Sequence, residues 1–151
     1  MESSVRKNIE GIRNAIADAA SRSGRKMSDV RLMAVTKTVD DNRILEAIEA
    51  GVDIIGESYV QEAKRKIEKM GRACEWHMIG YLQSNKAKYV VRLFDMIHSV
   101  DRMELAVELD RRAKAADRIM NILIEVNVSG EETKSGVPLI DAVQLIRDVA
   151  K

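Results

Sequence analysis

The sequence predicts an α/β fold in which one helix precedes five strand–helix units, whose strands form a parallel sheet. Short apolar runs alternate with amphipathic helical segments along the chain, which is typical of βαβ units. The apolar runs recur at intervals of roughly 19–27 residues, the length of one such unit. The chain has 151 residues, which suffice for five units, whereas a complete eight-fold barrel needs about 250.

The first segment predicts an amphipathic helix that packs one face against the rest of the protein. Its apolar residues are spaced by three or four positions, which places them on one helix face: Val5, Ile9, Ile12, Ile16 and Ala19. Gly24 follows as a C-terminal stop.

Five apolar runs then predict the strands, and each is followed by a helical pattern. The predicted strands cover residues 31–36, 52–56, 75–80, 94–100 and 120–128. The predicted helices begin at Asp40 or Asp41, Val60, Ser84, Asp101 and Pro138. Aspartate is a good N-cap residue and proline suits the first helical turn. Gly51 and Gly71 stand where two of these helices should stop.

Composition narrows the classes of protein to which the chain can belong. Its 25 basic and 24 acidic residues give a net charge of +1, which argues against a nucleic-acid binder. No apolar run approaches the ~20 residues of a membrane-spanning helix, and the N-terminus lacks the pattern of a signal peptide. Cys74, the single cysteine, has no partner for a disulfide or a metal site. We therefore expect one cytoplasmic α/β domain over residues 1–151, with no metal.

Polar residues follow each predicted strand, and in parallel α/β sheets ligands gather at these carboxyl ends. Lys37 stands out because it ends an apolar strand and does not lie on a helix face. A partly desolvated lysine has a lowered pKa and can form an imine with an aldehyde. A solvated lysine whose stem covers apolar neighbours fits the same position. His77 and His98 fit hydrogen-bonded structural histidines better than catalysts.

Five motifs at these strand ends are more specific. They are Ala34-Val-Thr-Lys-Thr, Gly56-Glu-Ser-Tyr-Val-Gln-Glu, Trp76-His-Met-Ile-Gly-Tyr-Leu-Gln-Ser-Asn-Lys, His98-Ser-Val-Asp and Asn127-Val-Ser-Gly-Glu-Glu-Thr-Lys-Ser-Gly. In this order they resemble the motifs of the pyridoxal phosphate homeostasis family. That family has a single-domain barrel similar to the N-terminal domain of alanine racemases, so the resemblance implies a partial (β/α)8 barrel.

The resemblance also implies a ligand and its binding residues. Lys37 would hold pyridoxal 5′-phosphate as a Schiff base, and Ser58, His77 and Asn127 would contribute to the cofactor site. The implied protein carries or buffers the cofactor in the cytoplasm, without established turnover and with no catalytic residue of its own.

Two departures from the family pattern affect this expectation. Ser58 stands where the family has asparagine, and its hydroxyl has a shorter reach. The phosphate-binding segments of the family belong to three further βα units that the sequence does not contain. Backbone amides at a helix N-terminus or arginine side chains bind phosphate best, so we expect weakened cofactor binding. We expect the chain to be an N-terminal piece, an engineered fragment or one part of an assembly.

Several alternatives remain open at this point. A racemase-type enzyme would need a second acid–base group, for which Tyr59 or His77 is a candidate. The chain could also be a scaffold without a working site. An unclosed barrel exposes two sheet edges, so a homodimer through those edges is a further expectation. The alternative fold is an open five-stranded sheet with the flavodoxin-like strand order.

Overall fold

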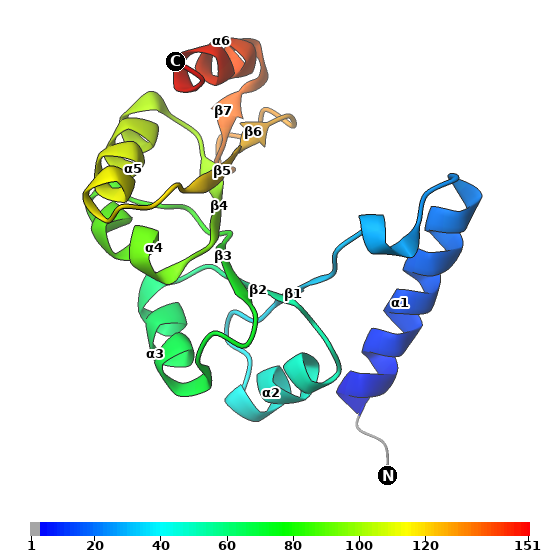
Figure 1. Cartoon of the computed structure of the whole chain (residues 1–151). Helices are drawn as coiled ribbons and strands as arrows, with labels where there is room; N and C mark the ends of the chain where they lie inside the picture. Colours follow the sequence, from blue (N-terminus) through cyan, green and yellow to red (C-terminus); the bar gives the residue numbers. More distant parts are fainter. Residues whose placement is uncertain (1–3) are drawn as a thin grey trace.

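The computed structural model describes residues 4–151, and its centre is a parallel sheet of five strands (Figure 1). The strands are β1 (Met33–Val35), β2 (Ile54–Glu57), β3 (Glu75–Met78), β4 (Met96–Val100) and β5 (Asn121–Ile124). They lie side by side in chain order, β1-β2-β3-β4-β5. A flavodoxin-like sheet would place β1 between β2 and β3, so that alternative is wrong. Each βα unit instead adds its strand next to that of the preceding unit, as in a (β/α)8 barrel. The predicted partial barrel is confirmed.

Helices connect successive strands, and α2 to α5 lie along one side of the curved sheet (Figure 1). The helices are α1 (Ser4–Arg22), α2 (Asp41–Glu49), α3 (Val60–Met70), α4 (Ala87–Leu93), α5 (Met103–Ala115) and α6 (Leu139–Val149). Two short 3-10 turns, η1 (Met27–Asp29) and η2 (Ser84–Lys86), precede β1 and α4. No helix within residues 4–151 is long and apolar enough to cross a membrane.

The main core lies between the sheet and these helices. Trp76 and Ile97 on the strands and Val90 and Leu105 on the helices are completely buried. Side chains alternate between the two faces of a strand, so the neighbours of Trp76 point to the opposite face of the sheet. On that face Val35 in β1 is 49% exposed. The fold therefore has one helix-covered face and one open face.

Several predicted helix ends are confirmed. Asp40 is the N-cap of α2, and its carboxylate accepts a hydrogen bond from the backbone N–H of Asn42 at 2.9 Å. Gly51 and Gly71 follow α2 and α3 with φ angles of +86° and +72°. Side chains rarely adopt such angles, which is why glycine ends these helices.

Several predicted boundaries are wrong. The fourth strand begins at Met96 and not at residue 94, and α6 begins at Leu139, because Pro138 belongs to β7. Residues 120–128 do not form one strand. At Glu125 the chain leaves β4 to form a second, two-stranded sheet of β6 (Val126–Asn127) and β7 (Val137–Pro138). Asp101 does not cap α5, because its carboxylate binds Arg102 at 2.5 Å and Arg102 occupies the N-cap position. The helix predicted from Ser84 begins only at Ala87, after the η2 turn.

Candidate functional site

Lys37 lies in a tight turn directly after β1, and its side chain is exposed. The backbone N–H of Thr36 donates to the carbonyl of Gly56 at 3.0 Å, which extends the β1–β2 pairing by one residue. The carbonyl of Thr36 accepts from the N–H of Val39 at 3.0 Å and closes the turn. Thr38 has a φ of +60°, which is unusual for a β-branched residue. The predicted lysine thus projects from a constrained turn at the carboxyl end of the first strand. Because Lys37 is exposed, the expected partial desolvation is wrong and the solvated alternative is confirmed.

A buried ion cluster lies beneath this turn on the helix-covered face. The Lys66 Nζ of α3 is within 2.6 Å of Glu57 Oε1 at the end of β2 and within 2.7 Å of Glu62 Oε1. It also donates to the carbonyl of Thr36 at 2.6 Å. Lys66 and Glu57 are both completely buried. The cluster therefore joins β2 and α3 directly to the residue that precedes Lys37.

The same carboxylates bind further groups of the turn. Glu62 Oε1 accepts the backbone N–H of Thr38 at 2.9 Å, and Glu57 Oε1 accepts the Thr36 hydroxyl at 2.5 Å. The hydrogen bond from Lys66 holds the pKa of Glu62 below its usual value, and the Thr38 N–H adds to this effect. Glu57 Oε2 has no hydrogen-bond partner among residues 4–151. Both neighbours of Lys37 are therefore held by ionised or buried side chains.

Sequence reasoning missed Lys66 because charged residues on helices are usually solvated. Its position carried a signal, however: Lys66 lies between Ala63 and Ile67, the two buried apolar residues of α3. A lysine inside the apolar stripe of an amphipathic helix needs a buried partner. Glu62, four residues earlier, and Glu57, at a strand end, supply that partner.

Ser58 follows β2 and lies next to Gly80, which follows β3. A Cβ atom on Gly80 would lie 2.4 Å from the backbone oxygen of Ser58 and 2.7 Å from its Cα. Only glycine permits this approach of the two strand ends. The Ser58 side chain is partly buried. Ser58 follows β2, and Lys37 follows the neighbouring strand β1, so the two predicted residues lie at adjacent strand ends.

His77 lies within β3, where it pairs with Gly56 of β2. Its side chain is buried, with Nδ1 3.0 Å from His98 Nε2 and Nε2 3.3 Å from Glu75 Oε2. Glu75 in turn accepts two hydrogen bonds from Arg31, at 2.7 and 3.1 Å. Burial, and then the proximity of His77, lowers the pKa of His98. The expectation that both histidines are hydrogen-bonded is confirmed, and they are bonded to each other.

Asn127 lies at the other edge of the sheet, after β5. Its amide oxygen accepts the Ser129 hydroxyl at 3.2 Å and the Gly130 N–H at 3.0 Å, and its amide nitrogen donates to the Glu131 carbonyl at 2.9 Å. The Asn127 side chain therefore organises its own loop. The structure brings Lys37, Ser58 and His77 to three neighbouring strands and leaves Asn127 apart from them.

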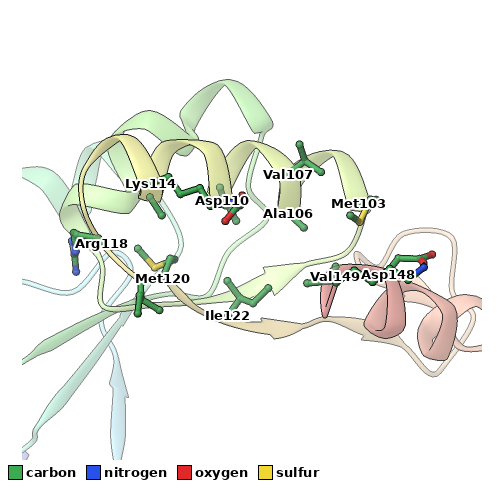
Figure 2. Close-up of a pocket in the computed structure, with 14 residues that line it drawn as sticks. Met103, Ala106, Val107, Asp110, Lys114, Arg118, Met120, Ile122, Asp148 and Val149 are labelled. Carbon is green, nitrogen blue, oxygen red and sulfur yellow. Dashed lines mark hydrogen bonds and ion pairs between the residues drawn. The ribbon is translucent and has the colours of Figure 1, made fainter.

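A separate hollow of about 870 Å³ lies between α5, α6 and the segment that enters β5 (Figure 2). Apolar side chains such as Ala106, Met120 and Val149 line it, with Asp110 and Lys114 at its rim. It does not include the strand ends that carry Lys37 and Ser58. Within residues 4–151, no group of three or more metal-ligating side chains is close enough to hold a metal ion.

Comparison with known proteins identifies the family. The family model described as "Alanine racemase, N-terminal domain" matches residues 8–151. The chain is 40% identical over 148 residues to the pyridoxal phosphate homeostasis protein of Escherichia coli K12, covering 95% of this chain and 63% of that protein. It is 42% identical over 139 residues to the protein of the same name from Vibrio cholerae, covering 89% and 59%.

Solved structures agree with this family. A protein from Bifidobacterium adolescentis matches with a TM-score of 0.89 and 37% identity, over 97% of this chain and 64% of that one. PipY of Synechococcus elongatus with PLP bound matches with a TM-score of 0.75 and 34% identity, over 90% and 64%. An alanine racemase of Clostridium difficile shares the fold, at a TM-score of 0.69 and 16% identity over 82% and 34%. The chain spans about 63% of the Escherichia coli relative. It resembles the pyridoxal phosphate homeostasis proteins, and it belongs to the family of alanine racemase N-terminal domains.

Proposed function

We propose that this chain binds pyridoxal 5′-phosphate through Lys37 and carries or buffers the cofactor. The observation that carries this proposal is the exposed amine of Lys37, in a constrained turn at the carboxyl end of β1. The names of the curated relatives, and PipY with PLP bound at 34% identity, support the choice of ligand.

The donor set suits this ligand, because a primary amine is the group that reacts with an aldehyde. Lys37 would hold pyridoxal 5′-phosphate by condensation of its amine with the aldehyde, with loss of one water. The turn limits the positions that the Lys37 side chain can reach. Ser58 and His77, on the next two strands, are candidates for polar contacts with the bound molecule.

Titration with pyridoxal 5′-phosphate tests the proposal. We expect the wild-type chain to develop an absorption band distinct from that of the free cofactor as pyridoxal 5′-phosphate is added, and the Lys37→Ala variant to lack this band. Lys64→Ala is the matched control, because Lys64 is an exposed lysine of α3 whose only ion pair within residues 4–151 is with Glu68, at 3.7 Å. An equal band in all three proteins would overturn the assignment to Lys37.

We further propose that residues 1–151 alone bind the cofactor weakly and gain little from its phosphate. The support is the chain's match to about 63% of its relative's length, together with the predicted site residues Ser58 and His77, which are neither arginine nor a helix N-terminus, the groups that bind phosphate best. Pyridoxal, which lacks the phosphate, is the probe. Nearly equal affinities for pyridoxal and pyridoxal 5′-phosphate support the proposal, and a strong preference for the phosphate contradicts it.

A carrier is favoured over a racemase by the state of the two histidines. His77, a candidate acid–base group of a racemase, has partners at both ring nitrogens: Nδ1 is 3.0 Å from His98 Nε2 and Nε2 is 3.3 Å from Glu75 Oε2. The curated relatives are named homeostasis proteins. We therefore expect no D-alanine from L-alanine with the cofactor-loaded chain, and its formation would favour the racemase.

We also propose that the chain folds as one unit, acts in the cytoplasm and self-associates through its sheet edges. Val35 on β1 and Leu123 on β5 are 49% and 46% exposed, and these two strands are the edges of the sheet. Light scattering is expected to give a dimer mass that Val35→Lys reduces. A monomer at all concentrations contradicts the dimer, and two unfolding transitions contradict the single unit.

A further inference from the structure

We propose that Lys66, Glu57 and Glu62 form a positioning cluster that fixes the turn around Lys37 and thereby sets how readily the Lys37 amine captures an aldehyde. The inference deepens the proposed function and rests on it for the identity of the ligand. None of the three residues needs to touch the ligand. They act through the backbone on either side of Lys37.

The geometry of Lys66 is the first support. An ammonium group has three N–H donors, and Lys66 Nζ has three acceptors, which are Glu57 Oε1 at 2.6 Å, Glu62 Oε1 at 2.7 Å and the Thr36 carbonyl at 2.6 Å. One of its three bonds thus goes to the residue that precedes Lys37. Because Lys66 and Glu57 are both completely buried, water does not compete for the bond between them.

The second support is the number of turn groups that the cluster binds. It holds the carbonyl of Thr36 through Lys66, the hydroxyl of Thr36 through Glu57 and the backbone N–H of Thr38 through Glu62. Lys37 lies between these two threonines. The peptide units on both of its sides are therefore fixed to groups of β2 and α3.

The third support is the conformation that the cluster maintains. Thr38 has a φ of +60°, and a β-branched residue adopts such an angle only when its surroundings impose it. Glu62 binds the N–H of that same residue at 2.9 Å. Without this bond the turn is free to relax toward negative φ, which would swing the Lys37 side chain away from its position.

Stability alone does not account for such a cluster. Replacing a buried ion pair with apolar side chains of similar volume is often neutral or stabilising. Lys66 lies in the apolar stripe of α3 beside Ala63 and Ile67, where an apolar residue would pack well. What the charged cluster adds is the directional hydrogen bonds to the turn.

The test compares two glutamates of the same helix. Glu62→Ala removes the acceptor for Thr38, and Glu62→Gln keeps an acceptor without the charge. Glu68→Ala is the matched control, because Glu68 is 65% exposed and, in the described part of the chain, forms an ion pair only with Lys64 at the surface. Glu62 is 22% exposed, so its truncation is expected to leave a folded protein. Lys66→Met is a second variant, and the same measurements are made on it if it folds.

Two measurements separate this inference from the proposed function. The first is the ratio of Lys37 to Lys7 modification in reductive methylation with formaldehyde, which needs no cofactor; Lys7 is an exposed lysine of α1, away from both glutamates. We expect Glu62→Ala to lower this ratio about threefold or more, a modest share of the contribution of a hydrogen bond to a charged group. We expect Glu62→Gln to recover most of it and Glu68→Ala to leave it unchanged.

The second measurement is the dissociation constant for pyridoxal 5′-phosphate, which we expect Glu62→Ala to raise about tenfold or more. A purely structural role for Glu62 would lower the stability of the variant but leave the methylation ratio and the dissociation constant unchanged, and this result overturns the inference. If the wild type fails to bind the cofactor at Lys37 while the ratio still falls in Glu62→Ala, the proposed function is wrong and the positioning role stands.

Discussion

Substituting Gly80 with alanine tests the close approach of the ends of β2 and β3. The added Cβ atom would lie 2.4 Å from the Ser58 carbonyl oxygen and 2.7 Å from the Ser58 Cα. Since Cβ atoms essentially never come within 3.0 Å of such neighbours, the backbone must move by about 0.6 Å or more. Both obstructing atoms belong to the main chain, so no side-chain rotation relieves the contact.

The size of the expected loss of stability follows from the cost of overpacking. Extra methyl groups forced into a packed site destabilise by about 1–3 kcal/mol. For a chain of this size, each kcal/mol lowers the melting temperature by roughly 2–4 °C. Gly80→Ala is therefore expected to lower the melting temperature by roughly 2–12 °C. The shift of Ser58 should also weaken cofactor capture at the neighbouring strand end.

Thermal unfolding followed by circular dichroism measures this change, and Gly11→Ala provides the matched control. Gly11 lies within α1, where an added Cβ atom meets nothing within 4 Å. Alanine is favoured over glycine in a helix by about 0.5–1 kcal/mol, so the same substitution should stabilise the protein there. A Gly80→Ala variant as stable as the wild type would refute the close packing of the two strand ends.

Four further predictions concern ionisable groups that are buried or partly buried. Because burial lowers the pKa of His98, the unfolded chain binds more protons. Stability should therefore fall as the pH drops through the ordinary histidine pKa of about 6.5, and His98→Gln should reduce this loss in urea titrations at about pH 7.5 and 5.5. Burial raises the pKa of the Cys74 thiol to about 11, so iodoacetamide should label Cys74 slowly in the native protein and rapidly in urea. Lys66→Met leaves two carboxylates without their buried cation and should cost about 3–5 kcal/mol in urea unfolding. Burial, and then Asp101, raises the pKa of Glu125, so its charged form weakens the fold above that pKa. Glu125→Gln should raise the melting temperature at neutral pH. It should not do so below about pH 4, where the glutamate of the wild type is as neutral as the glutamine of the variant.

Each of these predictions has a contradicting result. For His98, it is a wild-type pH dependence that the glutamine variant retains in full. For Cys74, it is equal labelling rates with and without urea. A Lys66→Met variant as stable as the wild type would show that the two carboxylates find other partners. A lower melting temperature for Glu125→Gln at neutral pH would mean that the charged carboxylate is stabilising.

The sequence predicted the order of strands and helices because hydrophobic periodicity and helix stops are local signals. Asp40 begins α2 and Gly71 ends α3, as expected. The chain order of the strands is not local, because it depends on how each unit packs against the previous one. The five motifs favoured the barrel arrangement over the flavodoxin-like order, and the sheet confirms it.

The parts that the sequence did not predict depend on contacts between distant residues. Lys66 meets the carbonyl of Thr36 from 30 positions away, and His77 meets His98 from 21 positions away. The separation of β6 from β5 depends on Glu125, whose N–H and carbonyl pair with different segments, β4 and β7. Helix and strand propensities contain no information about such partners. Lys37 was predicted as a site residue because it combines a local feature, the end of an apolar strand, with a motif.

The central claim is that Lys37 is the residue that captures pyridoxal 5′-phosphate. Its most direct test is to mix the purified chain with one equivalent of the cofactor, reduce with borohydride, and locate the added mass by peptide mapping. The account predicts that the label lies predominantly on the peptide that contains Lys37. A label spread evenly over the exposed lysines of the chain would contradict it.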